Sequence, residues 1–248
     1  MDTLLYALTS YGYRYFTLNL LTSLKKSNTT YDIIIYCLDK ESKEFFENEK
    51  YHAIHINSTE FVPDDFKELM EYGTLYFQKI NFYKHLIMEN LLKNIPSNIR
   101  YIIYLDGDII VFRDFIPYIK SICADPTVPG YIFQSDDEDI SVNNKNSRYI
   151  CGGIIIVDRS KIDSSKYIFV LDDPIWKTME DQGYMQYKVK TLNIPHYILD
   201  RDLFPNGVYL RNNKWVDINP FILHYNWLIG DEKEVKMKLN GHWYLDNM

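Results

Sequence analysis

The sequence has few cysteines and no pattern that would pair them. Its 248 residues include only Cys37, Cys123 and Cys151, with no Cys-x-x-Cys arrangement. Neither a disulfide framework nor a cysteine zinc site is therefore indicated, and a reducing compartment is expected.

The chain also lacks features that mark secreted, membrane and nucleic-acid-binding proteins. The N-terminus, Met1–Leu8, has no charged start and no long apolar run, so it is typical of a first strand and not of a signal peptide. No apolar run approaches membrane-spanning length. The net charge is −7, with 27 Lys and Arg against 34 Asp and Glu, so a global basic surface for nucleic acid is excluded. We therefore expect a cytoplasmic protein, with no membrane span, that needs a metal or a few placed lysines to bind an anionic substrate.

Internal repeats, low-complexity tracts and linkers are absent as well. No G-x-G-x-x-G follows a predicted strand, which argues against a dinucleotide-dependent dehydrogenase. The length is enough for one large domain with a buried core. We expect a single domain over residues 1–248.

Strands and helices alternate along the first half of the chain. Apolar patterns predict strands at 4–9, 32–38, 53–56 and 101–105, and helices at 13–26 and 75–93. This order favours an α/β fold with a mostly parallel sheet covered by helices. Ligands bind beyond the carboxyl ends of such strands, so Thr9, Ser10, Asp39 and Asp106 should converge on one crevice.

The second half is less regular. It predicts helices at 115–124, 174–187 and 231–239, and strands at 130–134, 149–158 and 221–225. An acidic run, Ser135–Asp139, follows one of these strands. Most charge runs are solvated loops, and that interpretation is favoured for this one.

The stretch Tyr104–Ile110 is the most informative part of the sequence. Asp106 and Asp108 interrupt an apolar run of strand length, where each charge would cost several kcal/mol unless it is compensated. In an extended chain, residues i and i+2 point to the same side, so the two carboxylates can aim at one point. A divalent cation there would compensate them. The alternative is a strand end and a hairpin turn, because Asp-Gly is common in turns; the apolar flanks favour the metal site.

Several short motifs occur along the chain in a fixed order. They are Phe77-Gln78-Lys79, Tyr104–Asp108 followed by Phe112-Arg113-Asp114, Ile150–Ile154, Glu180-Asp181-Gln182, Leu203-Phe204-Pro205, and His224-Tyr225-Asn226-Trp227 with Gly230 and Lys233. Together they resemble the GT-A glycosyltransferases, in the nucleotide-diphospho-sugar transferase group related to glycosyltransferase families 77 and 8. The departure is Cys151, where that family has an asparagine thought to touch the donor or acceptor sugar.

The resemblance implies a role for each matching residue. Asp106, Asp108 and His224 would hold Mn²⁺ or Mg²⁺, although His224 on sequence alone would be interpreted as a satisfied strand histidine. The residues implied for the donor are Thr9, Ser10, Tyr11 and Asp39 at the nucleoside, Lys79 and Lys233 at the diphosphate, and Asp106, Gly153, Asn226 and Gly230 nearby. Asp181 and Gln182 would be catalytic and face the donor sugar and the acceptor. The implied donor is a nucleotide-diphosphate sugar, most often UDP-linked, and the implied acceptor is a glycan or glycoprotein, with retention of configuration.

Two other functional classes use similar residues. A sugar-nucleotide hydrolase or nucleotidylyltransferase could use the same metal site, but a nucleotidylyltransferase should have a glycine-rich basic loop after the first strand, and Ser10–Tyr13 is not one. A non-catalytic sugar-nucleotide-binding domain, marked by Cys151, would be expected to lose its metal ligands first. Because those ligands are present, a metal-dependent transferase is the preferred interpretation.

Overall fold

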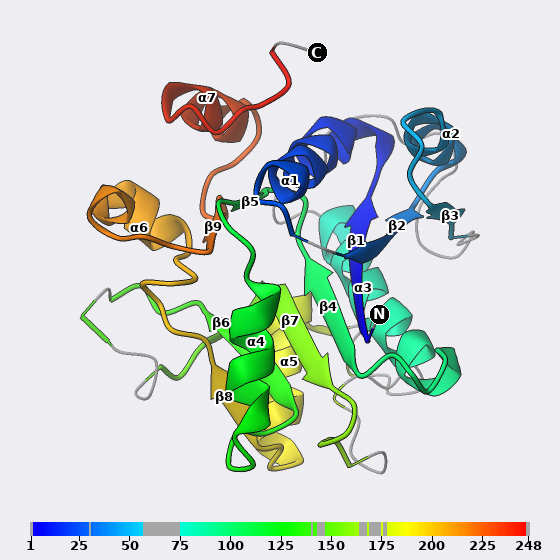
Figure 1. The fold of residues 1–248 in the computed structure, drawn as a ribbon, viewed down its shortest axis with the longest axis vertical. Coiled ribbons are helices and arrows are strands. Elements are labelled where there is room, and N and C mark those ends of the chain that lie inside the picture. The colour runs from blue at the N-terminus through cyan, green and yellow to red at the C-terminus, as the bar shows by residue number, and fades with distance from the viewer. Residues whose placement is uncertain are drawn as a thin grey trace.

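A mixed seven-stranded sheet organises the molecule (Figure 1). The computed structural model describes residues 2–29, 31–56, 75–139, 141–142, 147–163, 168, 175 and 178–246, with side chains from residue 80 onward in the helix that begins at Leu75. The strand order is β3-β2-β1-β4-β7-β6-β8. These strands are β1 (Thr3–Thr9), β2 (Asp32–Cys37), β3 (Ala53–His55), β4 (Tyr101–Leu105), β6 (Tyr131–Ser135), β7 (Ile150–Asp158) and β8 (His196–Ile198).

Four of the six strand pairings that the described residues form in this sheet are parallel, which confirms the predicted fold class. β1 pairs in parallel with β2 and β4, β2 with β3, and β6 with β8. Strand β7 runs antiparallel to both β4 and β6. The helices are α1 (Arg14–Lys26), α2 (Lys40–Asn48), α3 (Leu75–Asn94), α4 (Ile116–Ala124), α5 (Asp181–Thr191), α6 (Gly207–Arg211) and α7 (Asp231–Leu239). None of the described helices is both long and apolar enough to cross a membrane.

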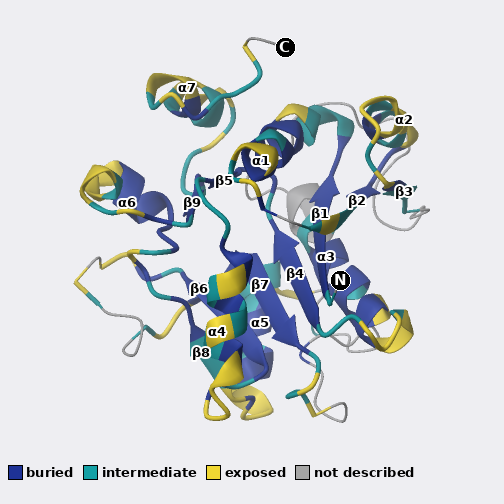
Figure 2. Ribbon diagram, in the orientation of Figure 1, coloured by how far each residue is buried: buried dark blue, intermediate teal, exposed yellow. Residues whose placement is uncertain are grey.

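The central strands are buried on both faces, as their continuous apolar sequences predict (Figure 2). Alternate residues of a strand point to opposite faces. Leu5 and Ile103 therefore pack with α1 in one apolar cluster, and Leu4 and Ile102 pack with α3 in the other. The apolar clusters on the two faces hold the sheet in place. They thereby position the side chains that follow the ends of its strands.

A small second sheet brings the C-terminal part of the chain to the end of β4. Strands β5 (Ile109–Val111) and β9 (Ile222–His224) pair antiparallel, with Ile109 opposite His224. The predicted strand at 221–225 is thus confirmed, and its partner is the apolar stretch directly after Asp108. This pairing places His224 next to the two aspartates.

Four elements differ from the sequence-based expectation. The helix predicted at 174–187 begins at Asp181 instead, because Glu180 has an extended backbone at the N-cap, and it continues to Thr191. Asp181 and Gln182 therefore lie in its first turn. Strand β8 and helix α6 were not predicted, since three and five residues carry too little periodicity. Helix α2 was not predicted either, because its buried residues are Ser42 and Phe46, which give its sequence little apolar periodicity. The uncertain segment 61–72 lies outside the described residues.

A buried histidine near the C-terminus predicts a stability change with pH. His242 is in an aromatic cluster with Phe112 and Trp215, and its Nδ1 lies 2.6 Å from the Tyr225 hydroxyl. Burial lowers the pKa of His242 to about 4, below its ordinary 6.5. Below pH 6.5 the unfolded chain therefore binds a proton that the folded chain does not. We expect this residue to reduce the free energy of unfolding by about 3 kcal/mol as pH falls from 6.5 to 4.

Urea denaturation across this pH range tests that expectation. His242→Gln keeps a hydrogen-bond acceptor and cannot titrate, so its unfolding free energy should fall less steeply with decreasing pH than that of the wild type. The exposed His52 provides the control, because His52→Gln should leave the slope unchanged. Equal slopes for His242→Gln and the wild type would contradict the assignment.

Candidate functional site

Two adjoining cavities lie at the carboxyl ends of β1, β4 and β6. The first is lined by residues that include Thr9, Ser10, Tyr13, Asp106, Asp108, His224, Asn226, Gly230 and Lys233. The second is lined by residues that include Lys84, Asp106, Asp136, Cys151, Gly153, Asp181, Gln182, His224 and Asn226. Asp106, His224 and Asn226 line both, so the two cavities meet at these side chains.

The two aspartates converge from a turn and not from an extended strand. Strand β4 ends at Leu105, and the Ile109 amide donates to the Asp106 carbonyl at 3.3 Å across the turn. A Cβ atom on Gly107 would lie 2.6 Å from Thr17 Oγ1, so only glycine lets this turn pack against α1. The two aspartates are therefore not in the extended chain that the sequence predicted. Their carboxylates still point to one place, because Asp106, Asp108 and His224 each offer one ligand atom within 4.8 Å of the others.

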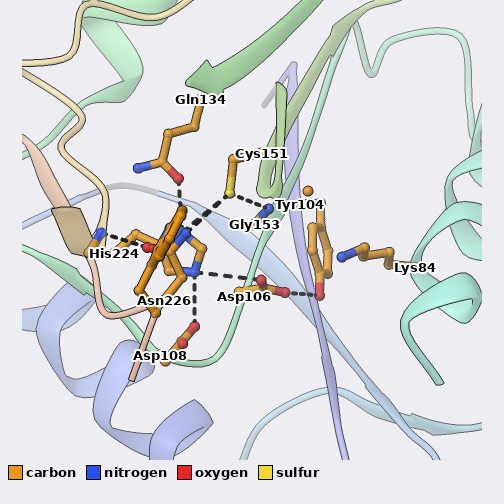
Figure 3. A network of polar contacts seen from close by, with 12 residues as sticks. Lys84, Tyr104, Asp106, Asp108, Gln134, Cys151, Gly153, His224 and Asn226 are labelled. Atoms are coloured by element: carbon orange, nitrogen blue, oxygen red, sulfur yellow. Dashed lines mark hydrogen bonds and ion pairs between the residues drawn. The ribbon is translucent and has the colours of Figure 1, made fainter. Parts of the chain in front are cut away.

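His224 completes this cluster from β9 (Figure 3). Its Nε2 lies 3.2 Å from Asp108 Oδ1 and 3.6 Å from Asp106 Oδ2, and within the described part of the chain this buried atom has no hydrogen-bond partner. Two carboxylates and one imidazole form a donor set that suits Mn²⁺, and Mg²⁺ less specifically. The residues present therefore fit a divalent cation.

Lys233 approaches the same cluster from α7. Its Nζ lies 2.5 Å from Asp108 Oδ2 and 3.0 Å from the Tyr13 hydroxyl. Burial alone would lower the pKa of Lys233, but the Asp108 carboxylate raises it above its ordinary value, so the ammonium stays charged. Burial likewise opposes ionisation of Asp108, and the Lys233 ammonium outweighs it and lowers the pKa of that carboxyl. The first cavity thus holds a fixed positive charge beside the cation site.

Asp181 forms a buried ion pair with Lys84, a residue that none of the sequence motifs includes. Lys84 Nζ lies 2.6 Å from Asp181 Oδ2, and the lysine side chain is 3% exposed. Burial alone would lower the pKa of Lys84, but Asp181 raises it above its ordinary value. The signal in the sequence was a lysine beside Tyr83 on the apolar side of the predicted helix, where an unpaired charge would not be stable.

Gln182 is held at both ends of its amide. Its Nε2 donates to Asp136 Oδ2 at 2.6 Å, and its Oε1 accepts from the Gly152 amide at 3.3 Å. Asp136 also accepts hydrogen bonds from Asn226 Nδ2 and Trp227 Nε1, each at 3.2 Å. Burial raises the pKa of Asp136, although these donors oppose the shift. The acidic run is therefore not a solvated loop at Asp136, which belongs to the second cavity.

Three predicted donor residues lie differently. Neither Tyr11 nor Asp39 is among the described residues that line the two cavities. Asp39 accepts from the Tyr11 amide at 2.8 Å and from the Ser42 amide at 2.7 Å, so it caps α2 and ties it to the end of β1. Lys79 belongs to α3, but its side chain lies outside the described residues. Their contacts with a donor stay predictions.

Gly153 makes room for the His224 ring. A Cβ atom at this position would lie 2.0 Å from His224 Cε1. Atoms cannot approach this closely, so we expect Gly153→Ala to displace the ring from its position beside the aspartates. The displacement should lower Mn²⁺ affinity by about tenfold or more. Isothermal titration with Mn²⁺ measures this. Gly183→Ala is the control, since its Cβ would meet nothing closer than 3.4 Å. Wild-type Mn²⁺ affinity in Gly153→Ala would contradict the inference that the position of the His224 ring determines metal binding.

Comparisons with solved structures show a glycosyltransferase fold. The glycosyltransferase GlyE of Streptococcus pneumoniae TIGR4 matches at a TM-score of 0.59 and 15% identity, over 99% of this chain but 60% of that one. A glycosyltransferase involved in glycosylation of the major capsid of PBCV-1 matches at 0.57 and 14%, over 96% of this chain and 100% of that one. The galactosyltransferase LgtC, in complex with donor and acceptor sugar analogs, matches at 0.55 and 13%, over 96% and 95%.

Sequence comparison gives the family. No curated protein matches the sequence. A family model described as nucleotide-diphospho-sugar transferase matches residues 29–239, which include the aspartate turn, α5, β9 and Lys233. The chain therefore belongs to the nucleotide-diphospho-sugar transferase family and has its GT-A fold.

Proposed function

We propose that the protein transfers a sugar from a nucleotide-diphosphate sugar, with UDP as the expected nucleotide, to a hydroxyl group of a glycan or glycoprotein. One observation carries the proposal: Nε2 of His224, which has no hydrogen-bond partner among the described residues, faces Asp106 and Asp108 where the two cavities meet. On one side of that point lies Lys233, and on the other lie Asp181 and Gln182. This arrangement suits a diphosphate on the Lys233 side and a reacting sugar on the Gln182 side.

The residues of the first cavity would bind and stabilise the diphosphate. Mn²⁺ or Mg²⁺ held by Asp106, Asp108 and His224 would stabilise the negative charge of the leaving diphosphate as a Lewis acid. Lys233 adds a second positive charge there and neutralises diphosphate oxygens. The Tyr104 hydroxyl donates to Asp106 Oδ1 and fixes the direction of that carboxylate.

The second cavity provides the polar groups for the sugar. Gln182 and Asp181 lie at the start of α5 and line the cavity that Asp106 and His224 also line. We assign Gln182 to steadying positive charge at the anomeric carbon through its amide oxygen, and Asp181 to orienting sugar hydroxyls. Both halves of the chain contribute to the cavities, since β1 and β4 come from the first half and α5, β9 and α7 from the second. That sharing supports a single domain.

A product assay tests the proposed reaction. The protein is incubated with Mn²⁺ and single sugar nucleotides, with and without a panel of glycan acceptors, and both nucleoside diphosphate and sugar product are quantified. We expect diphosphate release that increases with one acceptor class, and a product with the donor's anomeric configuration by NMR. Equal release without any acceptor would indicate a hydrolase, and binding without release would indicate a non-catalytic domain.

A further inference from the structure

Gln134 occupies the side of His224 that faces away from the aspartates (Figure 3). It lies near the end of β6, and its side chain is fully buried. The register between β6 and β7 shifts between Phe133 and Gln134, so that Phe133 pairs with Ile155 and Gln134 with Cys151. Such a bulge redirects a side chain relative to a regular strand, and here the side chain points to the imidazole.

The orientation of the Gln134 amide is fixed by its other contacts. Nε2 donates to the carbonyl oxygens of Phe204 and Pro205, each at 3.0 Å. Carbonyl oxygens only accept hydrogen bonds, so the amide cannot be reversed without placing its oxygen against two others. Oε1 therefore faces His224 Nδ1, at 2.8 Å.

This contact determines which ring nitrogen of His224 carries the proton. An amide oxygen can only accept, so Nδ1 must donate, and in the neutral ring the lone pair is then on Nε2. That lone pair points toward Asp106 and Asp108, whose ionised carboxylates have no hydrogen to donate, so a bound cation would satisfy it. The backbone amide of His224 also donates to the Pro205 carbonyl, at 3.1 Å, so one segment holds both the histidine and its partner.

We propose that Gln134 is a positioning residue of the metal centre, which sets the tautomer and ring plane of His224 so that Nε2 is available as a ligand. The inference rests on the proposed metal-dependent function. It also explains the Leu203-Phe204-Pro205 motif, whose last two carbonyls orient the Gln134 amide. Cys151 Sγ, at 3.7 Å from Nδ1, is a weaker partner of the same nitrogen.

The first test needs no substitution at Gln134. Nitrogen NMR of the metal-free protein, labelled with ¹⁵N-histidine, distinguishes protonated from unprotonated ring nitrogens, and His224→Ala identifies the signals of this ring. We expect the Nδ1–H form, with Nε2 unprotonated in the neutral ring. A neutral His224 with its proton on Nε2 would overturn the proposal, whether or not the protein binds metal.

The second test is a double-mutant cycle on Mn²⁺ affinity, measured from the free-Mn²⁺ signal in electron paramagnetic resonance. Gln134→Met keeps the length and removes the acceptor, and it should weaken Mn²⁺ binding about 10- to 100-fold. In a His224→Ala background the same change should have no further effect. A wild-type affinity in Gln134→Met, or an equal loss in both backgrounds, would overturn the proposal. Absence of Mn²⁺ binding to the wild type would instead contradict the proposed function. In that case the NMR measurement of the His224 tautomer would still test the role of Gln134.

Discussion

Gln182→Ala is expected to lower kcat by about a hundredfold while donor affinity changes little. The Gln182 amide is held between Asp136 and the Gly152 amide, at the wall of the second cavity, and no charge is removed with it. A group that acts mainly in the transition state lowers kcat and kcat/KM together, whereas a group that only binds substrate raises KM. Steady-state kinetics with the true acceptor distinguish these two effects.

Gln186 provides a matched control one turn along the same helix. Its amide is likewise held at both ends, here by two backbone groups, because Oε1 accepts from the Ile150 amide at 3.2 Å and Nε2 donates to the Arg148 carbonyl at 2.7 Å. It is not among the residues that line either cavity. Gln186→Ala should keep near-normal kcat. If Gln182→Ala does so as well, the catalytic assignment is wrong, and Asp136 becomes the next candidate.

Asp181→Ala is expected to cause the largest loss of stability among substitutions in the site, about 3–5 kcal/mol in the free energy of unfolding. The change leaves the Lys84 ammonium, which is 3% exposed, without the carboxylate 2.6 Å away. Chemical denaturation measures the loss. Replacing Lys84 with methionine in the same chain should restore most of it, since the unpaired charge is then gone.

The adjacent Glu180 is the control for this prediction. Its side chain is exposed and makes no capping hydrogen bond, so Glu180→Ala should change the unfolding free energy by less than about 0.5 kcal/mol. A similarly small change in Asp181→Ala would show that the ion pair is not important for stability. Because folding and catalysis are both affected at Asp181, its role in transfer is better tested with Asp181→Asn, for which we expect kcat to fall about a hundredfold.

The sequence was most informative where the signal is local. Continuous apolar runs predicted β1, β4 and β7, and the strand-end rule placed Thr9, Ser10 and Asp106 around one cavity. The Asp106 and Asp108 pair was visible because charges in an apolar run need compensation.

Other parts of the site depend on contacts between distant segments. Asp136 looked like part of a solvated acidic run, but its partners are Gln182, Asn226 and Trp227, which only the fold brings to it. Gln134 is an unremarkable strand residue until β9 places His224 beside it. Single-sequence patterns carry no information on such pairings, so these residues became apparent only in three dimensions.

Donor binding is expected to depend on a cation held by Asp106, Asp108 and His224. Isothermal titration of UDP into the protein, with Mn²⁺ and with a chelator, tests it most directly. We predict at least about tenfold tighter binding with Mn²⁺, and no such difference in Asp108→Asn, because loss of a metal ligand removes the link between the two. Equal UDP affinity with Mn²⁺ and with chelator in the wild-type protein would contradict a metal-dependent donor site.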